Sequence, residues 1–397
     1  MTQAKTQRGT RAAARSSPSA GGWTADVVTT REQLQAYAGE WNDLLARSRA
    51  NTIFLTWEWV SAWLDAVYPD APLMVVAVRD GDGRLAAVAP FYRSHLRLLG
   101  LLRYRCLRVI GDCHCGAEYM DIIVREGCEE AATASIVESL LRHADPWDCI
   151  YVPNVAGWTG GLGRLAAGLG GALAYVHTRP RSFAAVELPD THEEYLRTLS
   201  RRHRSNVKRQ EKRLSADHDV KFLRCQSEQE LPRFLEAFFA LHQRRWQSAG
   251  QEGSFVRKPP MERFYRRFSR EALRRGWLRV VALEVDGAFQ ATQYGYAYGG
   301  TFYSMQEGYH PESMKGIGNI LRVRAIQSCI EEGLKLYDFL GEYTDHKRHW
   351  EARPRWGGDV FIGRGSLRNR LLFWKEIWPV GRYIQEGRPA NEGRFYD

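Results

Sequence analysis

Alternating apolar and polar residues predict three consecutive strands in the second half of the chain. Residues 278–285 end at Asp286-Gly287, a dipeptide typical of a tight hairpin turn. Residues 290–298 alternate back to a second turn at Gly299-Gly300, and residues 301–309 follow as the third strand. The pattern therefore indicates an antiparallel meander.

A glycine turn, a helix and a further strand are predicted directly after this meander. Apolar residues recur at helical spacing through 320–330, and an apolar run covers 334–340. Two glycines before the helix leave backbone N–H groups bare at its N-terminus, where unpaired amides and the helix dipole attract an anion. The glycines could equally ease a tight strand-to-helix turn, and the sequence leaves both interpretations open. The candidate anion loop is Lys315, Gly316, Ile317, Gly318 and Asn319.

The first half repeats the hairpin pattern at an offset of about 205 residues, which is typical of two related domains. Residues 75–78, a turn at 80–83 and residues 85–90 mirror the hairpin around Asp286-Gly287. No equivalent of the later glycine pair is evident there, so the first copy is expected to lack an anion site.

Positive charge is concentrated in two segments of a chain with a net charge of +10. The N-terminal tail carries four basic residues and no acid, and it is rich in Ala, Ser, Thr and Gly, which predicts disorder. Residues 201–213 hold seven Lys and Arg against Glu211 alone. As a helix this segment buries a thin apolar stripe and exposes a wide basic sector.

Two interpretations of this basic helix stay open. It is a solvated charged face, or it attracts an anionic partner: the phosphates of a cofactor, a nucleotide-linked or lipid-linked sugar, a tRNA acceptor arm or an anionic membrane surface. In the second case Arg204, Lys208 and Arg209 are the candidate substrate-binding residues.

Composition excludes several classes of protein. Hydrophobic residues make up 44% and aromatic residues 12% of 397 positions, enough for two ordinary cores. No apolar run reaches the 18 or more residues of a membrane helix, and an odd number of cysteines, seven, fits a reducing compartment. A cytoplasmic location is expected. On a strand, Cys113 and Cys115 would point away from His114, so no metal site is expected. The aromatic residues between Phe54 and Tyr68 are interpreted as helix core rather than as a sugar-stacking platform.

Several short motifs, taken in order, resemble the tandem-GNAT acyltransferases. That group includes the CelD-like and BioF2-like acetyltransferases and, more distantly, the Fem aminoacyl transferases. The motifs are residues 53–59, the basic run 200–214, the glycine loop 316–321, and the segment 338–341 followed by Lys347 and Trp350. Many relatives carry a proline before the loop glycine, where this chain has Lys315.

The resemblance implies a mixed α/β fold of two tandem GNAT-like domains, each a mainly antiparallel sheet flanked by helices. Residues 24–185 would form a degenerate first domain and residues 186–385 the acyl-CoA-binding domain, with tails at 1–23 and 386–397. The implied activity is transfer of an acyl group from acyl-CoA, acetyl-CoA foremost, to the amine or hydroxyl of a small-molecule or sugar-linked acceptor, without a metal. A role in polysaccharide or cell-envelope biosynthesis would follow. The alternatives are a Fem-like aminoacyl transferase that uses charged tRNA and a non-catalytic scaffold of exopolysaccharide assembly.

Direct acyl transfer requires a group that stabilises the developing oxyanion and a base for the proton of the nucleophile. Glu307 near the end of the third strand and Asp338 in the strand after the helix are the candidate bases. The resemblance implies that Lys347 stabilises the oxyanion and that Trp350 lies beside the substrate. Each has an ordinary alternative, a strand-end carboxylate or a surface-loop lysine.

Overall fold

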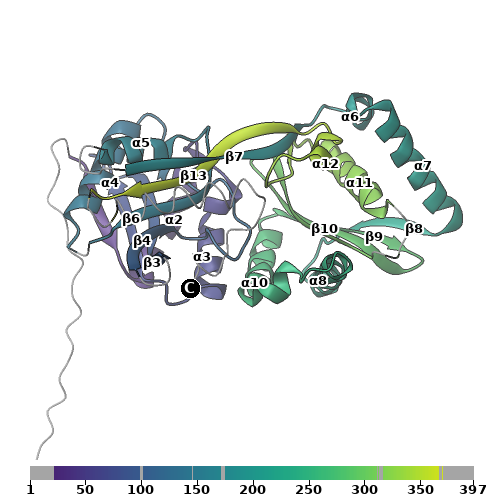
Figure 1. Cartoon of the computed structure of the whole chain (residues 1–397), viewed down its shortest axis with the longest axis horizontal. Helices are drawn as coiled ribbons and strands as arrows, with labels where there is room; N and C mark the ends of the chain where they lie inside the picture. The colour runs from purple at the N-terminus through teal and green to yellow at the C-terminus, as the bar shows by residue number, and fades with distance from the viewer. Residues whose placement is uncertain are drawn as a thin grey trace, which may run out of the picture.

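The computed structural model describes residues 22–98, 102–144, 146–170, 175–310, 312, 316–365 and 369. Lys315 and the predicted tail segments 1–21 and 386–397 lie outside these residues. The described chain is a mixed α/β protein with one large sheet flanked by helices (Figure 1).

The first half contributes these elements in chain order: β1 (Thr24–Val28), α1 (Arg31–Gln35), α2 (Ala38–Ala46), the short 3-10 helix η1 (Ile53–Leu55), α3 (Trp57–Ala66), β2 (Leu73–Arg79), β3 (Leu85–Leu98), β4 (Leu102–Val109), β5 (Ile123–Val124), α4 (Glu129–Arg142), β6 (Cys149–Ala156), α5 (Gly161–Leu169) and β7 (Tyr175–Glu187).

The second half continues with α6 (His192–Thr198), α7 (Arg201–Asp217), β8 (Val220–Arg224), α8 (Leu231–Ser248), α9 (Ser254–Arg257), α10 (Pro259–Arg274), β9 (Leu278–Val285), β10 (Ala288–Tyr298), β11 (Thr301–Tyr309), α11 (Ile317–Glu331), β12 (Leu336–Asp338), α12 (Asp345–Arg348) and β13 (Arg353–Gly363). The predicted meander, the helix after it and the basic helix are confirmed. The strand expected over 334–340 is shorter, because only Leu336–Asp338 pair with their neighbours.

All described strands but β5 follow one path across the sheet, in the order β1-β2-β3-β4-β6-β13-β7-β12-β11-β10-β9-β8. β13 is last in the chain, yet it lies between β6 and β7 and is antiparallel to both. β7 pairs in turn with β12 of the second half. The sheet is thus continuous, and the division expected between residues 185 and 186 is crossed by the return of β13.

The two halves contain the same arrangement of elements. In each, three antiparallel strands are followed by a helix and then by a strand parallel to the third: β2-β3-β4-α4-β6 and β9-β10-β11-α11-β12. The two helices begin differently. α4 has Glu129 and Glu130 in its first turn, whereas α11 follows Gly316 and has no acid there. Two carboxylates at a helix N-terminus disfavour a phosphate.

An aromatic core joins the halves. Trp59 of α3 is fully buried, and its ring lies 4.6 Å from Phe264 and 5.0 Å from Phe268, both on α10. The predicted core role is confirmed for Phe54, Trp59 and Trp63, whereas Tyr68, beyond the end of α3, is 40% exposed. Figure 1 shows α3 and α10 side by side where the halves meet. One hydrophobic cluster therefore contains residues of both halves, in place of the two separate cores that composition allowed.

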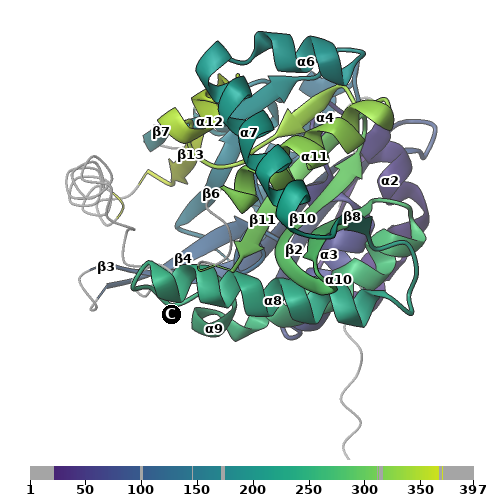
Figure 2. The same cartoon turned by 90° about the vertical axis from the view of Figure 1, so that its right-hand side faces the viewer.

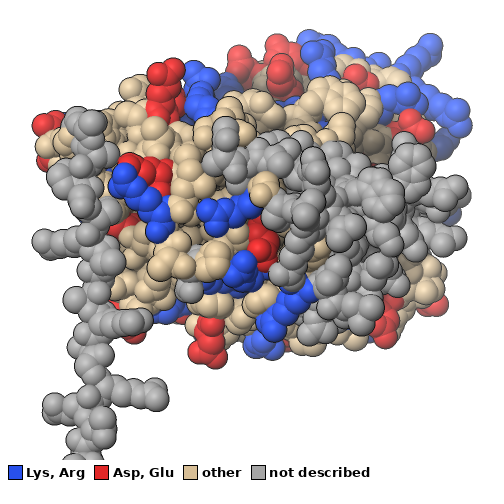
Figure 3. All heavy atoms as spheres, turned by 60° about the vertical axis from the view of Figure 1, so that its left-hand side comes forward, with Lys and Arg blue, Asp and Glu red and all other residues tan. Residues whose placement is uncertain are grey.

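Helices cover the second half of the sheet on both faces. α11 packs on one face of β10 and β11, and α8 packs on the opposite face (Figure 1). α7 lies outside α11 and contacts it, as Figure 2 shows. The face of the first half that is turned forward in Figure 3 carries acidic and basic side chains interspersed.

Candidate functional site

The N-terminus of α11 presents backbone amides beside a glycine of unusual conformation. Gly316 has φ 95°, in the left-handed region, and a Cβ atom there would lie 2.2 Å from the amide nitrogen of Gln210 on α7. The amides of Asn319 and Ile320 close onto the Gly316 carbonyl oxygen at 2.8 and 3.2 Å. No described residue accepts a hydrogen bond from the amide of Ile317 or Gly318. The turn therefore requires glycine at 316, and two amides remain for an anion.

Gly318 is different, because its surroundings do not require glycine. A Cβ atom there would lie 3.5 Å or more from the Tyr309 ring, an ordinary contact. Glycine in a helix costs about 1 kcal/mol relative to alanine, and packing among the described residues does not explain that cost. A ligand that approaches the backbone closely would explain it.

Strands β11 and β12 separate next to this helix terminus. They pair only from Thr301–Leu336 to Tyr303–Asp338, and the register of β11 against β10 shifts between Ser304 and Gln306. Beyond that point β11 pairs with β10 alone among the described strands. The second half therefore has an opening between two parallel strands, which α11 borders.

Glu307 lies in this opening but is engaged in a buried ion pair. It accepts hydrogen bonds from Nε and Nη2 of Arg322 on α11 and from Gln293 on β10. Burial alone would raise the pKa of Glu307, but the charges of Arg322 and Arg245 and these hydrogen bonds hold it below its ordinary value. Such a carboxylate anchors α11 to the sheet and is a weak proton acceptor, contrary to what its sequence position led us to expect.

Asp338 lies where the halves meet. Its carboxylate is fully buried and accepts hydrogen bonds from the Tyr119 hydroxyl at 2.8 Å and from the Leu340 amide at 2.9 Å. Burial raises the pKa of Asp338 to about 6. A carboxyl group that titrates near neutrality is suited to proton transfer.

Glu118, from the first half, reaches the same place. Its Oε1 accepts a hydrogen bond from the Gly341 amide at 2.7 Å, and its buried Oε2 has no partner among the described residues. Burial first, and then the charge of Asp338, raise the pKa of Glu118 to about 8. Sequence analysis missed this residue, because it stands in a loop between β4 and β5 with no motif around it.

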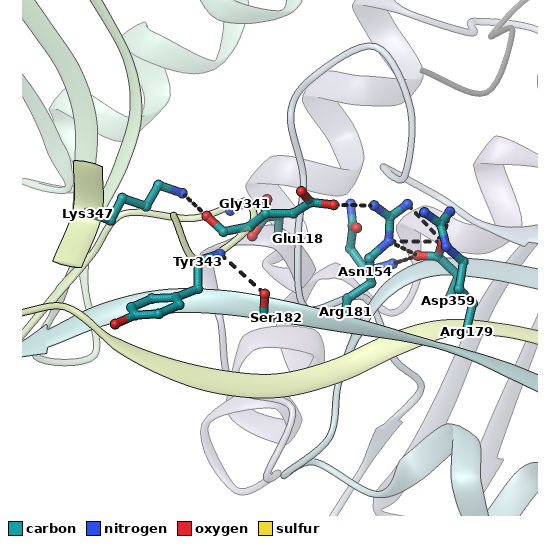
Figure 4. Close-up of polar contacts among 10 residues, drawn as sticks. Glu118, Asn154, Arg179, Arg181, Ser182, Gly341, Tyr343, Lys347 and Asp359 are labelled. Atoms are coloured by element: carbon teal, nitrogen blue, oxygen red, sulfur yellow. Dashed lines mark hydrogen bonds and ion pairs between the residues drawn. The ribbon is translucent and has the colours of Figure 1, made fainter. Parts of the chain in front are cut away.

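Lys347 closes the loop that carries Gly341. Its ammonium donates to the carbonyl oxygens of Leu340 and, at 2.8 Å, of Glu342. Burial lowers its pKa, opposed by the charges of Glu118 and Asp338. A Cβ atom on Gly341 would lie 3.5 Å from this ammonium and 3.8 Å from Oε1 of Glu118. Lys347 and Glu118 therefore flank the same glycine, as Figure 4 shows.

A second polar network holds the returning strand beside this loop. Asp359 of β13 is 2% exposed and receives hydrogen bonds from Arg179 and Arg181 of β7 and from the Asn154 amide of β6. Arg181 also forms an ion pair with Glu342 of the loop at 3.4 Å. The crossing of β13 thus fixes the position of the loop relative to the first half.

The candidate substrate-binding residues of the second half are not brought together. Arg204 donates to the Leu196 carbonyl oxygen at 2.9 Å, so it caps the end of α6 instead of facing a ligand. Trp350 is fully buried and has no surface for a substrate. Lys208 is exposed, and the exposed Arg209 contacts Asn206 at 2.9 Å.

A surface cavity of about 680 Å³ lies along the first turns of α7. It is lined by Ser200, Arg202, His203, Ser205, Asn206, Arg209 and His349. These side chains include two guanidinium groups and no carboxylate, which favours an anionic occupant.

The expected strand around Cys113 is wrong. His114 has φ 55° in an irregular loop, and the Cys115 thiol donates to the Gly111 carbonyl oxygen at 2.9 Å. The described residues contain no group of three His, Cys, Asp or Glu side chains placed to hold a metal ion. Within the same residues, no helix is both long and apolar enough to span a bilayer.

The comparisons with known proteins agree with a GNAT-like fold. Residues 201–348 match the family model of the acetyltransferase (GNAT) domain. No curated protein matches the chain by sequence.

Solved structures share this fold over nearly their whole length. FemX aligns with 13% identity and a TM-score of 0.60, covering 85% of this chain and 98% of FemX. A conserved protein of unknown function from Bacteroides thetaiotaomicron aligns with 12% identity and a TM-score of 0.51, covering 82% of this chain and 97% of that protein. The C-terminal domain of a putative lysylphosphatidylglycerol synthetase from Agrobacterium fabrum aligns with 11% identity and a TM-score of 0.50, covering 86% of this chain and 96% of that domain. At these identities the likeness concerns the fold alone.

Proposed function

We propose that the protein transfers an acyl group from an acyl-CoA, acetyl-CoA foremost, to an amine. The observation that carries this proposal is the α11 N-terminus: two amides without an acceptor among the described residues, a glycine at 318 that their packing does not require, and an adjacent opening between β11 and β12. The amides of Ile317 and Gly318 would bind the pyrophosphate, and the pantetheine arm would enter the opening.

Glu118, Asp338 and Lys347, here called the junction cluster because they lie where the halves meet, would supply the chemistry. The amine nitrogen attacks the thioester carbonyl carbon, its proton passes to the carboxylate pair of Glu118 and Asp338, and the coenzyme thiolate leaves. The Lys347 ammonium would stabilise the oxyanion. A hydroxyl acceptor would react in the same way. We place the acceptor, a small molecule or a sugar-linked amine of polysaccharide or cell-envelope biosynthesis, between the halves.

Calorimetric titration with coenzyme A tests the donor site. Gly318→Asp should abolish binding, because the added carboxylate repels the pyrophosphate where a side chain otherwise fits. Gly163→Asp is the matched control, since Gly163 is also a helical glycine with open space around it. A folded Gly318→Asp protein that binds coenzyme A as the wild type does would refute the phosphate-loop assignment.

A Fem-like aminoacyl transferase that uses charged tRNA is the second candidate. The exposed basic side chains of α7 and the acid-free cavity beside them favour it. Thermal protection separates the candidates, because a ligand of the folded state raises the melting temperature. Protection by acetyl-CoA but not by tRNA supports the first, the reverse supports the second, and protection by neither supports the non-catalytic scaffold.

A further inference from the structure

Arg355 of β13 lies beside the junction cluster, and its guanidinium donates no hydrogen bond to a described residue. Its guanidinium lies 3.6 Å from the centre of the Trp158 ring, and its Nη1 is 3.8 Å from Oδ2 of Asp338. That separation is an ion pair without a hydrogen bond. No described side chain or carbonyl accepts a hydrogen bond from Arg355, whose side chain is 32% exposed. Stacking therefore fixes the plane of a guanidinium that can still bind a carboxylate in a bidentate manner.

Trp158 extends this site to the surface. It lies in the loop after β6, is 37% exposed and packs 5.1 Å from the ring of Tyr119. The Tyr119 hydroxyl in turn donates to Asp338. An apolar ring, a cation and a buried carboxylate thus follow one another from solvent to the proton-accepting pair.

We propose that the acceptor is an α-amino acid, or a compound that ends in the same amine and carboxylate. The inference rests on the acyl transfer proposed above and names the acceptor class of that site. The carboxylate would pair with Arg355, the amine would lie at Asp338 and Glu118, and an apolar side chain would pack on Trp158. In an α-amino acid the nitrogen and the carboxyl carbon are about 2.5 Å apart, since only Cα separates them. A zwitterion of this size can therefore pair with both members of the Arg355–Asp338 couple, 3.8 Å apart, at once.

Calorimetry with defined ligands tests the inference without requiring turnover. Leucine, phenylalanine and tryptophan are each titrated beside the corresponding amide and the decarboxylated amine, and phosphoethanolamine serves as the phosphate-bearing amine. We expect the amino acids to bind and the amides and amines to bind at least 10-fold more weakly. Arg355→Gln should weaken amino acid binding by about 10- to 100-fold, the usual worth of hydrogen bonds between charged groups, and Arg355→Lys should restore part of it.

Two neighbours on β13 provide matched controls. Arg353→Gln removes an exposed positive charge two residues away and should leave binding unchanged. Trp158→Ala should weaken the binding of phenylalanine and tryptophan. Trp356→Ala should not, because Trp356, although 64% exposed, is the next residue after Arg355 and points to the opposite face of the strand.

The outcomes separate this inference from the proposed function. Equal binding of acids and amides, preference for phosphoethanolamine, or binding of none of these ligands overturns the inference. Acyl transfer to amines regardless of a carboxylate leaves the proposed function standing and removes the acceptor class. Amino acid binding that depends on Arg355, without transfer from any acyl-CoA, supports the ligand class and removes the reaction.

Discussion

The two carboxyl groups at the junction of the halves predict a distinctive pH dependence of turnover. The pKa of Asp338 is raised to about 6 and that of Glu118 to about 8, the latter partly by the charge of Asp338. A base acts when it has lost its proton, so activity should rise with pH in two steps. With a pKa near 8, only about one-tenth of Glu118 is ionised at pH 7. We expect kcat/KM to increase roughly tenfold between pH 7 and pH 9.

Single substitutions show which residue causes the step in activity near pH 8. Glu118→Gln should remove it and reduce turnover by roughly 10²-fold or more, the usual contribution of general base catalysis. Asp338→Asn should instead move the step to lower pH, because the charge that raises the pKa of Glu118 is gone. Asp190→Asn, at an exposed carboxylate, should change neither step.

The incoming amine also titrates, so two acceptors whose amines differ in pKa must be compared in the same assay. A step that follows the pKa of the acceptor and persists in Glu118→Gln would refute the role of this pair.

Unfolding provides a readout without substrate. The folded protein holds the Glu118 proton more tightly than the unfolded chain does, so stability should fall as pH rises from about 4.5 to about 8. Glu118→Gln should flatten that dependence.

Three further predictions concern the second half. Gly316→Ala should lower the melting temperature, since alanine is strained at φ 95°, whereas Gly318→Ala should not. Glu307→Gln should cost about 3–5 kcal/mol in urea unfolding, because it leaves Arg322 buried and unpaired, while turnover per folded molecule changes less; a loss of turnover in a protein of unchanged stability would contradict this. Neutralising Lys208 and Arg209 together should weaken the binding of an anionic ligand, coenzyme A or tRNA, and flatten its salt dependence while the fold stays intact. An unchanged salt dependence would make α7 a solvated face.

The sequence predicted local elements well because their signals are local. Asp286-Gly287 at the turn of the β9–β10 hairpin, the alternation through β11 and the helical spacing of α11 each lie within a few residues of the structure that they specify. The same holds for the aromatic stripe of α3, which is buried as its spacing indicates. Cys113 to Cys115 show the limit, because a short alternating run there is held in a loop by contacts such as the one from Cys115 to Gly111.

Most of the candidate site could not be predicted because its contacts are distant in sequence. Tyr119 and Asp338 are hydrogen-bonded across 219 positions, and Glu118 and Gly341 across 223. No periodicity connects such residues. Glu307 differs, because its partner Arg322 is only 15 positions away: the sequence predicted its place on β11 but gave no sign of the ion pair that makes it an anchor for α11.

The return of β13 places the first half beside the proposed acceptor site, although its own helix α4 begins with two glutamates. β13 carries Arg355, and it is held between β6 and β7 by pairing along both edges and by the ion pairs of Asp359. β7 then pairs with β12, which ends in Asp338. The first half thus contributes Glu118 and Trp158 directly and positions Arg355 and Asp338 through the sheet. In the proposed reaction the first half would form the acceptor side of the site, and α11 of the second half would hold the donor.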